Sequence, residues 1–181
     1  MSNRDDVRGS AAGDLIQEAV VLRRFPTALA VLVAACLPTG ERVLTEAERR
    51  ATEDTVRQLM ASMQAAANAR DVDRLMTHYS PVGTFAAQGT LLTREGVYTN
   101  LKSYYGTLRE LDFQWQRLEV DVLSPDAATL TGLAVSEATD TAGNRLRGRR
   151  VYTGVLARRG GQWQIVNWHL SMPPDPSARR E

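Results

Sequence analysis

Two consecutive β-strands joined by a tight glycine turn constrain the fold of this chain more than any other feature. The segment from Arg150 to Ser171 reads RVYTGVLARRGGQWQIVNWHLS. Its central Gly-Gly pair is typical of a hairpin turn between two strands. The second strand ends in Asn-Trp-His-Leu-Ser, and a tryptophan, a histidine and a serine at the end of a buried-type strand indicate that this end lines a polar cavity. The chain is therefore expected to fold around an interior pocket.

The composition is that of an ordinary folded domain. The chain has 181 residues, 43% of them hydrophobic, and a formal net charge of +1, which predicts one domain with or without a short appendage. No long basic stripe is present, so nucleic-acid binding has no electrostatic support. Cys36 is the only cysteine, which excludes a disulfide within this chain and a cysteine metal cluster. His78 and His169 are the only histidines and have no HExxH spacing, so we expect no metal and no cofactor.

Arginines gather in one part of the predicted hairpin region. They are Arg145, Arg147, Arg149 and Arg150, with Arg158 and Arg159 across the turn. Two interpretations stay open: the side chains are solvated at strand edges, or they form a rim that binds an anion.

Residues 1–36 have the pattern of an export signal. Arg23 and Arg24 precede an apolar run over residues 25–35, which suits the hydrophobic region of a secretory signal and is too short to span a membrane. The sequence Val-Ala-Ala-Cys that ends at Cys36 resembles the lipobox of bacterial lipoproteins, in which the cysteine is lipidated.

This resemblance implies a lipid anchor at Cys36, a tether over residues 37–44 and a location in the cell envelope or outside the cell. The membrane is then contacted only through the anchor. Four acidic residues precede Arg23, which is unusual for a signal. They indicate either a later start codon or no signal, and without a signal the protein would be cytoplasmic.

The pattern of one α+β domain covers residues 45–173. Thr45 and Glu48 predict a capping box at the start of a long helix, and Asp71 and Thr93 are expected to cap a second and a third helix. Four long strands are predicted after the helices, over residues 113–123, 128–140, 145–159 and 162–172. Helices followed by an antiparallel meander predict a curved sheet that closes over the helices around a cavity. Residues 174–181 are expected to form a loose tail.

The element order and the last strand resemble the SnoaL-like (DUF4440-type) domains of the NTF2-like superfamily. The last strand of these domains typically reads G-x-W-x-x-x-x-x-H-x-S, and Trp163, His169 and Ser171 match that pattern. The resemblance implies an NTF2-like (cystatin-like) cone of α+β class, with about three N-terminal helices packed on a curved, mainly antiparallel sheet. It also implies a homodimer formed through the sheet, with Trp168 in the dimer contact.

Side-chain alternation in the last strand suggests which residues face the pocket. Alternation puts Trp168 on one face of this strand. The residues expected on the opposite face are Trp163, Ile165, Asn167, His169 and Ser171. We expect the last three to line the open end of the pocket, with His169 either a catalytic acid/base or a structural histidine. Tyr79 and Trp115 are predicted to line the wall. Glu137 is the strand carboxylate that could act as a base, although solvent exposure is the commoner role for such a residue.

Three functions stay open at this point. The first is binding of a small apolar or amphipathic molecule in the pocket. The second is a lyase, isomerase or cyclase of the SnoaL kind that uses His169 as acid/base. The third is a homodimerisation module without a ligand. Proton abstraction as in the related steroid isomerases is not supported, because the position of their carboxylate base corresponds to Ala87 here.

Overall fold

Residues 43–172 are described by the structure, a computed structural model. The predicted signal segment, Cys36, residue 173 and the predicted tail over residues 174–181 lie outside the described residues. The helices and strands are α1 (Glu46–Asn68), α2 (Val72–Met76), β1 (Tyr79–Ala87), β2 (Thr90–Leu92), α3 (Arg94–Gly106), β3 (Leu108–Ser124), β4 (Ala127–Asp140), β5 (Arg145–Arg159) and β6 (Gln162–Ser171). None of the helices in this part of the chain has the length and apolarity needed to cross a membrane.

One mixed sheet contains all six strands, in the order β2-β1-β6-β5-β4-β3. The predicted antiparallel meander of four long strands is confirmed as β3 to β6, although β3 begins five residues earlier than expected, at Leu108. The short strand β1 runs parallel to β6, a pairing between segments that are about 80 residues apart in sequence. The sheet is therefore mainly antiparallel, as predicted, with one parallel pair.

Each of these helices begins directly after the residue predicted to cap it. The Thr45 hydroxyl accepts a hydrogen bond from the Glu48 backbone N–H, and the Glu48 carboxylate accepts one from the Thr45 backbone N–H at 3.0 Å. The side chains of Asp71 and Thr93 accept equivalent bonds at the starts of α2 and α3. These bonds satisfy backbone donors that have no partner within the helix.

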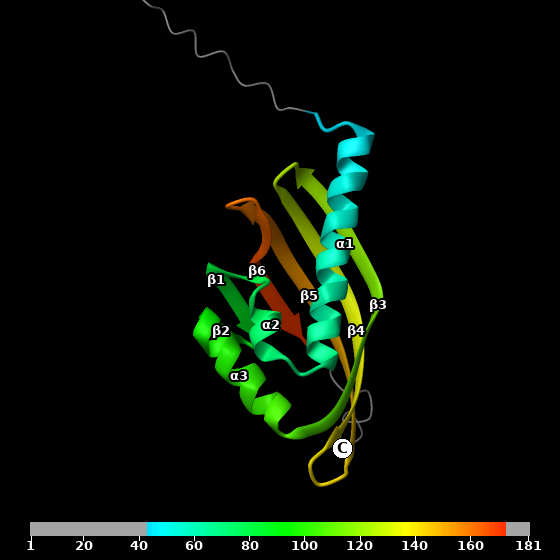
Figure 1. Cartoon of the computed structure of the whole chain (residues 1–181), viewed down its shortest axis with the longest axis vertical. Coiled ribbons are helices and arrows are strands. Elements are labelled where there is room, and N and C mark those ends of the chain that lie inside the picture. The colour runs from blue at the N-terminus through cyan, green and yellow to red at the C-terminus, as the bar shows by residue number, and fades with distance from the viewer. Residues whose placement is uncertain (1–42, 173–181) are drawn as a thin grey trace, which may run out of the picture. The chain divides into compact units, whose positions relative to one another are not determined.

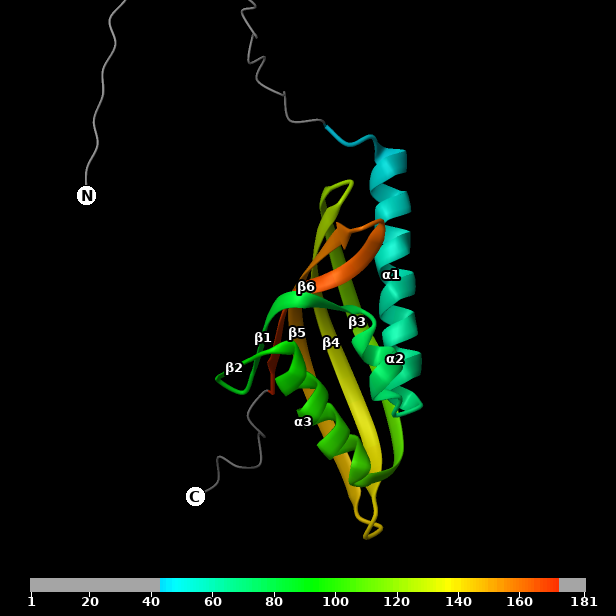
Figure 2. The same ribbon diagram turned by 60° about the vertical axis from the view of Figure 1, so that its left-hand side comes forward.

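The three helices of residues 43–172 lie on the same face of the sheet (Figures 1 and 2). The largest fully buried side chains come from both layers and form the core between them: Val56, Met60, Phe85, Leu130, Leu156 and Ile165. We call the face toward the helices the inner face. The outer face of β4, β5 and β6 carries no helix from the described part of the chain.

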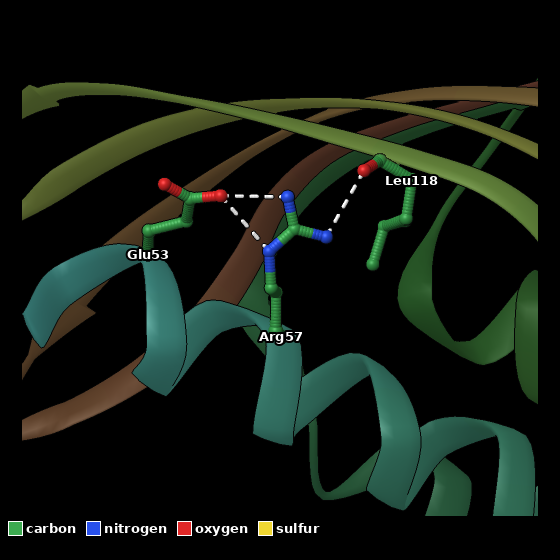
Figure 3. Close-up of polar contacts among 3 residues, drawn as sticks. All are labelled: Glu53, Arg57 and Leu118. Carbon is green, nitrogen blue, oxygen red and sulfur yellow. Dashed lines mark hydrogen bonds and ion pairs between the residues drawn. The ribbon is translucent and has the colours of Figure 1, made fainter. Parts of the chain in front are cut away.

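Helix α1 lies along the free edge of β3 and supplies partners for its backbone (Figure 1). Arg57 is held by Glu53 and donates to the Leu118 carbonyl oxygen at 3.1 Å (Figure 3). Asn68 donates to the Phe113 carbonyl at 3.2 Å and accepts from the Phe113 N–H at 2.6 Å. An uncovered edge strand exposes unpaired backbone groups that can pair with other chains, and α1 protects β3 from this.

Candidate binding cavity

A cavity of about 770 Å³ lies between the helices and the inner face of the sheet. Every helix and strand of the described chain contributes to its lining, from Met63 on α1 to Leu170 on β6. This volume lies within the range of about 300–1,000 Å³ that is typical of small-molecule sites. The predicted interior pocket is therefore present.

Aromatic side chains build one wall of the cavity. Phe113 and Trp115 meet edge to face, with ring centroids 5.1 Å apart. Tyr152 lies 5.2 Å from Trp115 and 5.3 Å from Trp168, so the four rings form a continuous layer across β3, β5 and β6. The Trp115 indole N–H donates to the Met60 carbonyl at 3.4 Å, so the one polar group of this side chain has a partner. We call these four residues the aromatic wall.

A polar site lies on the same inner face, formed by Arg150 and Ser136. Arg150 is half-buried and lines the cavity, and its Nη1 donates to the hydroxyl oxygen of the buried Ser136. The guanidinium lies over Gly148, where a Cβ atom would be 2.8 Å from Nη1. Gly148 therefore leaves the space beside β5 that the guanidinium occupies.

Three tyrosines near the cavity are held in the neutral form. Burial raises the pKa of Tyr152 to about 12, and the nearby Arg150 guanidinium only partly opposes this increase. Burial also raises the pKa values of Tyr79 and Tyr105 above the ordinary value of a phenol. At physiological pH these phenols can donate hydrogen bonds to a ligand, but they are poor general bases.

The structure brings together only two of the six predicted pocket residues. Tyr79 and Trp115 line the cavity. Asn167, His169 and Ser171 lie on β6 but are not among the residues that line it. Glu137 lies on the outer face of β4, exposed to solvent, with its carboxylate 3.0 Å from Nη2 of Arg147.

A β-bulge in β6 explains the positions of Asn167, His169 and Ser171. Val155 pairs with Asn167 and Leu156 pairs with Ile165, so Val166 is an extra residue in β6. One extra residue moves all following side chains to the opposite face of a sheet. Trp168 therefore points inward with Ile165, and His169 points outward.

The expectations for His169 and Trp168 are corrected accordingly. Trp168 is 6% exposed and lines the cavity, so its predicted place in an outer-face dimer contact is wrong. His169 is exposed, and no hydrogen-bond partner reaches its side chain from the described residues. The predicted placement of Asn167, His169 and Ser171 at the open end of the pocket is wrong for the same reason.

The sequence pattern left open whether Arg150 faces solvent or a binding site, and it did not indicate a role for Ser136 or Phe113. The arginine group divides between the two faces of β5, since Arg147 pairs with Glu137 at the surface and Arg150 lines the cavity. A signal was present in the sequence: Arg149 and Arg150 are neighbours in a strand, and consecutive side chains point to opposite faces. One of these two arginines had to face the interior.

Comparison with models of known protein families identifies the family of this chain. The sequence model of the SnoaL-like domain matches residues 56–175. The chain belongs to the SnoaL-like domain family. This match includes every strand of the described chain and the cavity-lining residues Ser136 and Arg150, and it begins inside α1. No match is found among curated proteins.

Solved structures show the same NTF2-like fold. An NTF2-like protein of unknown function from Pseudomonas putida is 23% identical, covers 72% of this chain and 93% of its own, and has a TM-score of 0.61. A candidate scytalone dehydratase from Novosphingobium aromaticivorans is 14% identical, with coverages of 71% and 89% and a TM-score of 0.65. The hexachlorocyclohexane dehydrochlorinase LinA-type3 from Novosphingobium barchaimii is 17% identical, with coverages of 71% and 90% and a TM-score of 0.59. The shared fold therefore occurs in enzymes and in proteins of unknown function alike.

Proposed function

We propose that this SnoaL-like protein binds a small, largely apolar molecule in its cavity. The observation that carries this proposal is the aromatic wall beside a space of about 770 Å³. Aromatic rings provide large contact areas to an apolar ligand at little cost in side-chain entropy. A cone that served only for assembly would be expected to be filled by its own side chains, so the cavity favours the binding function.

The chemistry of the lining favours binding over acid–base catalysis. No histidine, aspartate or glutamate is among the described residues that line the cavity. A lyase or isomerase of the SnoaL kind needs a general base that is deprotonated near neutral pH. His169 cannot serve as this base within the cavity, because it lies on the outer face. Tyr79, Tyr105 and Tyr152 have raised pKa values and do not replace such a base. Two of the structural neighbours are named as enzymes, but this chain shares only its fold with them, and a shared fold does not determine the reaction.

The proposal can be tested with N-phenyl-1-naphthylamine, a neutral apolar probe whose fluorescence increases in apolar surroundings. We expect saturable binding to the full chain. Ala87→Phe should weaken binding at least about tenfold, because Ala87 lines the cavity and a phenyl ring there would occupy part of the space. Phenylalanine suits a strand position, so the variant is expected to fold.

The matched control is Thr84→Phe, which adds the same ring to the same strand. Thr84 is exposed and pairs with Asn167, whereas Ala87 pairs with Leu170. Binding by this variant should equal that of the wild type. Absence of saturable binding to the wild type, or equal binding by all three proteins, would contradict the proposed function.

Two finer expectations remain proposals. A homodimer through the outer face is compatible with the absence of a covering helix there within residues 43–172, but Trp168 does not contribute to it. Lipidation at Cys36 and location in the cell envelope are supported by the lipobox-like sequence alone.

A further inference from the structure

The geometry around Arg150 points to the ligand's chemical class. We infer that the ligand is an apolar molecule with a single carboxylate group, which the Arg150 guanidinium binds while the apolar body packs on the aromatic wall. This inference rests on the proposed function and names the kind of molecule that the cavity takes.

The fold directs Arg150 inward. It pairs with Ala134, a fully buried residue on the inner face of β4, while Arg149 pairs with Val135 and is exposed. Gly148 and Ser136 are also partners across the two strands, so a residue without a side chain lies beside the hydroxyl that accepts from Arg150. The guanidinium is thus held at the cavity surface by the residues around it.

The charge of Arg150 has no counter-ion in the described part of the chain. Arg57, Arg147 and Arg158 each form an ion pair with a carboxylate at the protein surface. Arg150 is half-buried, and among residues 43–172 its side chain has only the hydroxyl of Ser136 as a hydrogen-bond partner.

A guanidinium has five N–H donors, so most of those on Arg150 are free to bind a ligand. A partly buried cation without a partner raises the free energy of the folded protein. A ligand carboxylate would accept two parallel hydrogen bonds from the guanidinium and neutralise its charge.

The rest of the lining favours a monoanion over a phosphate. Arg150 is the only lysine or arginine among the described residues that line the cavity. A phosphate dianion would keep an uncompensated negative charge beside apolar side chains, which is costly, whereas one carboxylate matches one guanidinium. Tyr105 and Tyr152 lie close enough to Arg150 for its positive charge to lower their pKa values, although burial raises these values more. Their neutral phenols can donate hydrogen bonds to the carboxylate.

The test compares two probes of the same shape, 2-naphthoate and neutral 2-naphthamide, as competitors of N-phenyl-1-naphthylamine. For the wild type we expect naphthoate to bind about tenfold or more tightly than the amide, the gain typical of hydrogen bonds to a charged group. In Arg150→Gln this preference should fall to about one. Arg149→Gln removes the same charge from the outer face and should keep the wild-type preference.

The outcomes separate the two proposals. If N-phenyl-1-naphthylamine binds but both naphthalene probes compete equally, or naphthoate does not compete, the carboxylate inference is wrong and the apolar binding function stands. A preference for naphthoate that survives in Arg150→Gln also overturns the inference, because another group then reads the charge. If no probe binds the wild type, both proposals fail. Far-ultraviolet circular dichroism checks that each variant is folded, and Arg150→Lys, which keeps the charge without the planar fork, should retain an intermediate preference.

Discussion

Two strand glycines decide where the cavity tryptophans lie. A Cβ atom on Gly154 would be 2.3 Å from Cε3 of Trp168, and one on Gly132 would be 2.6 Å from Cζ3 of Trp115. An indole ring therefore occupies the space that a side chain at each glycine would take, and it covers the strand at that point. The aromatic wall depends on these two small residues as much as on its rings.

We expect Gly154→Ala to destabilise the protein by about 1–3 kcal/mol, because the added methyl group overlaps the Trp168 ring. The shift of Trp168 should also weaken the binding of N-phenyl-1-naphthylamine. Urea unfolding, monitored by circular dichroism, measures the first effect, and probe titration the second.

Gly106→Ala serves as the control for the same chemical change. Apart from the adjacent residues and the backbone of α3 itself, no heavy atom of the described residues lies within 4 Å of a Cβ built at Gly106, the last residue of α3. This variant should be neutral or more stable by up to about 1 kcal/mol, because alanine restricts the unfolded chain. Equal losses in the two variants would show that the close approach to Trp168 is not responsible.

At the scale of the element, the bulge in β6 determines which side chains reach the cavity. If β6 had no bulge and Val166 took a regular place in the alternation, Asn167 and His169 would lie inside and Trp168 outside. The bulge reverses this and gives the cavity an indole in place of an imidazole. The apolar character of the site therefore depends on the register of one strand.

We predict opposite results for the two neighbours in β6. Trp168→Ala should lower the free energy of unfolding by about 3–5 kcal/mol and Trp168→Phe by less, and both should weaken binding of N-phenyl-1-naphthylamine. His169→Ala should change stability by no more than about 0.5 kcal/mol and leave probe binding unchanged, since the side chain is exposed. Chemical denaturation and probe titration check these values. Loss of binding in His169→Ala would contradict the outward position of this side chain that the bulge produces.

At the scale of the whole molecule, burial of tyrosines around the cavity links stability to pH. The pKa values of Tyr79, Tyr105 and Tyr152 are raised in the folded protein, that of Tyr152 to about 12. The unfolded chain therefore releases these phenol protons first, near pH 10. Below pH 10 both states are protonated and the three residues contribute no pH dependence.

As the pH rises above about 10, we expect the free energy of unfolding to fall, by up to about 1.4 kcal/mol per pH unit for each buried phenol. In Tyr152→Phe the slope between about pH 10 and 11 should be smaller by up to one such contribution. Urea unfolding at a series of pH values from 8 to about 11 measures it. Identical slopes for the wild type and the variant would show that the Tyr152 phenol is not linked to folding.

Local sequence features determined the helix starts, the hairpin turns and the succession of elements. The caps at Thr45, Asp71 and Thr93 are confirmed because a cap bonds to residues only three positions away. Gly160 and Gly161 both have positive φ, as the tight turn between β5 and β6 requires. The last-strand motif with Trp163 was enough to identify the SnoaL-like fold, since the family model matches residues 56–175.

Only the tertiary structure decided which side chains meet in the cavity. The bulge at Val166 depends on how β6 pairs with β5, and the parallel pairing of β1 with β6 joins segments that are far apart in the chain. The inward direction of Arg150 depends on the phase of β5 relative to the buried face of β4. Sequence patterns describe interactions over a few residues, whereas register is set by partners across the sheet, and one residue of difference exchanges the two faces. For this reason the cavity could be predicted from the sequence, but its lining could not. The cavity is lined by Trp168 and Arg150 and not by His169.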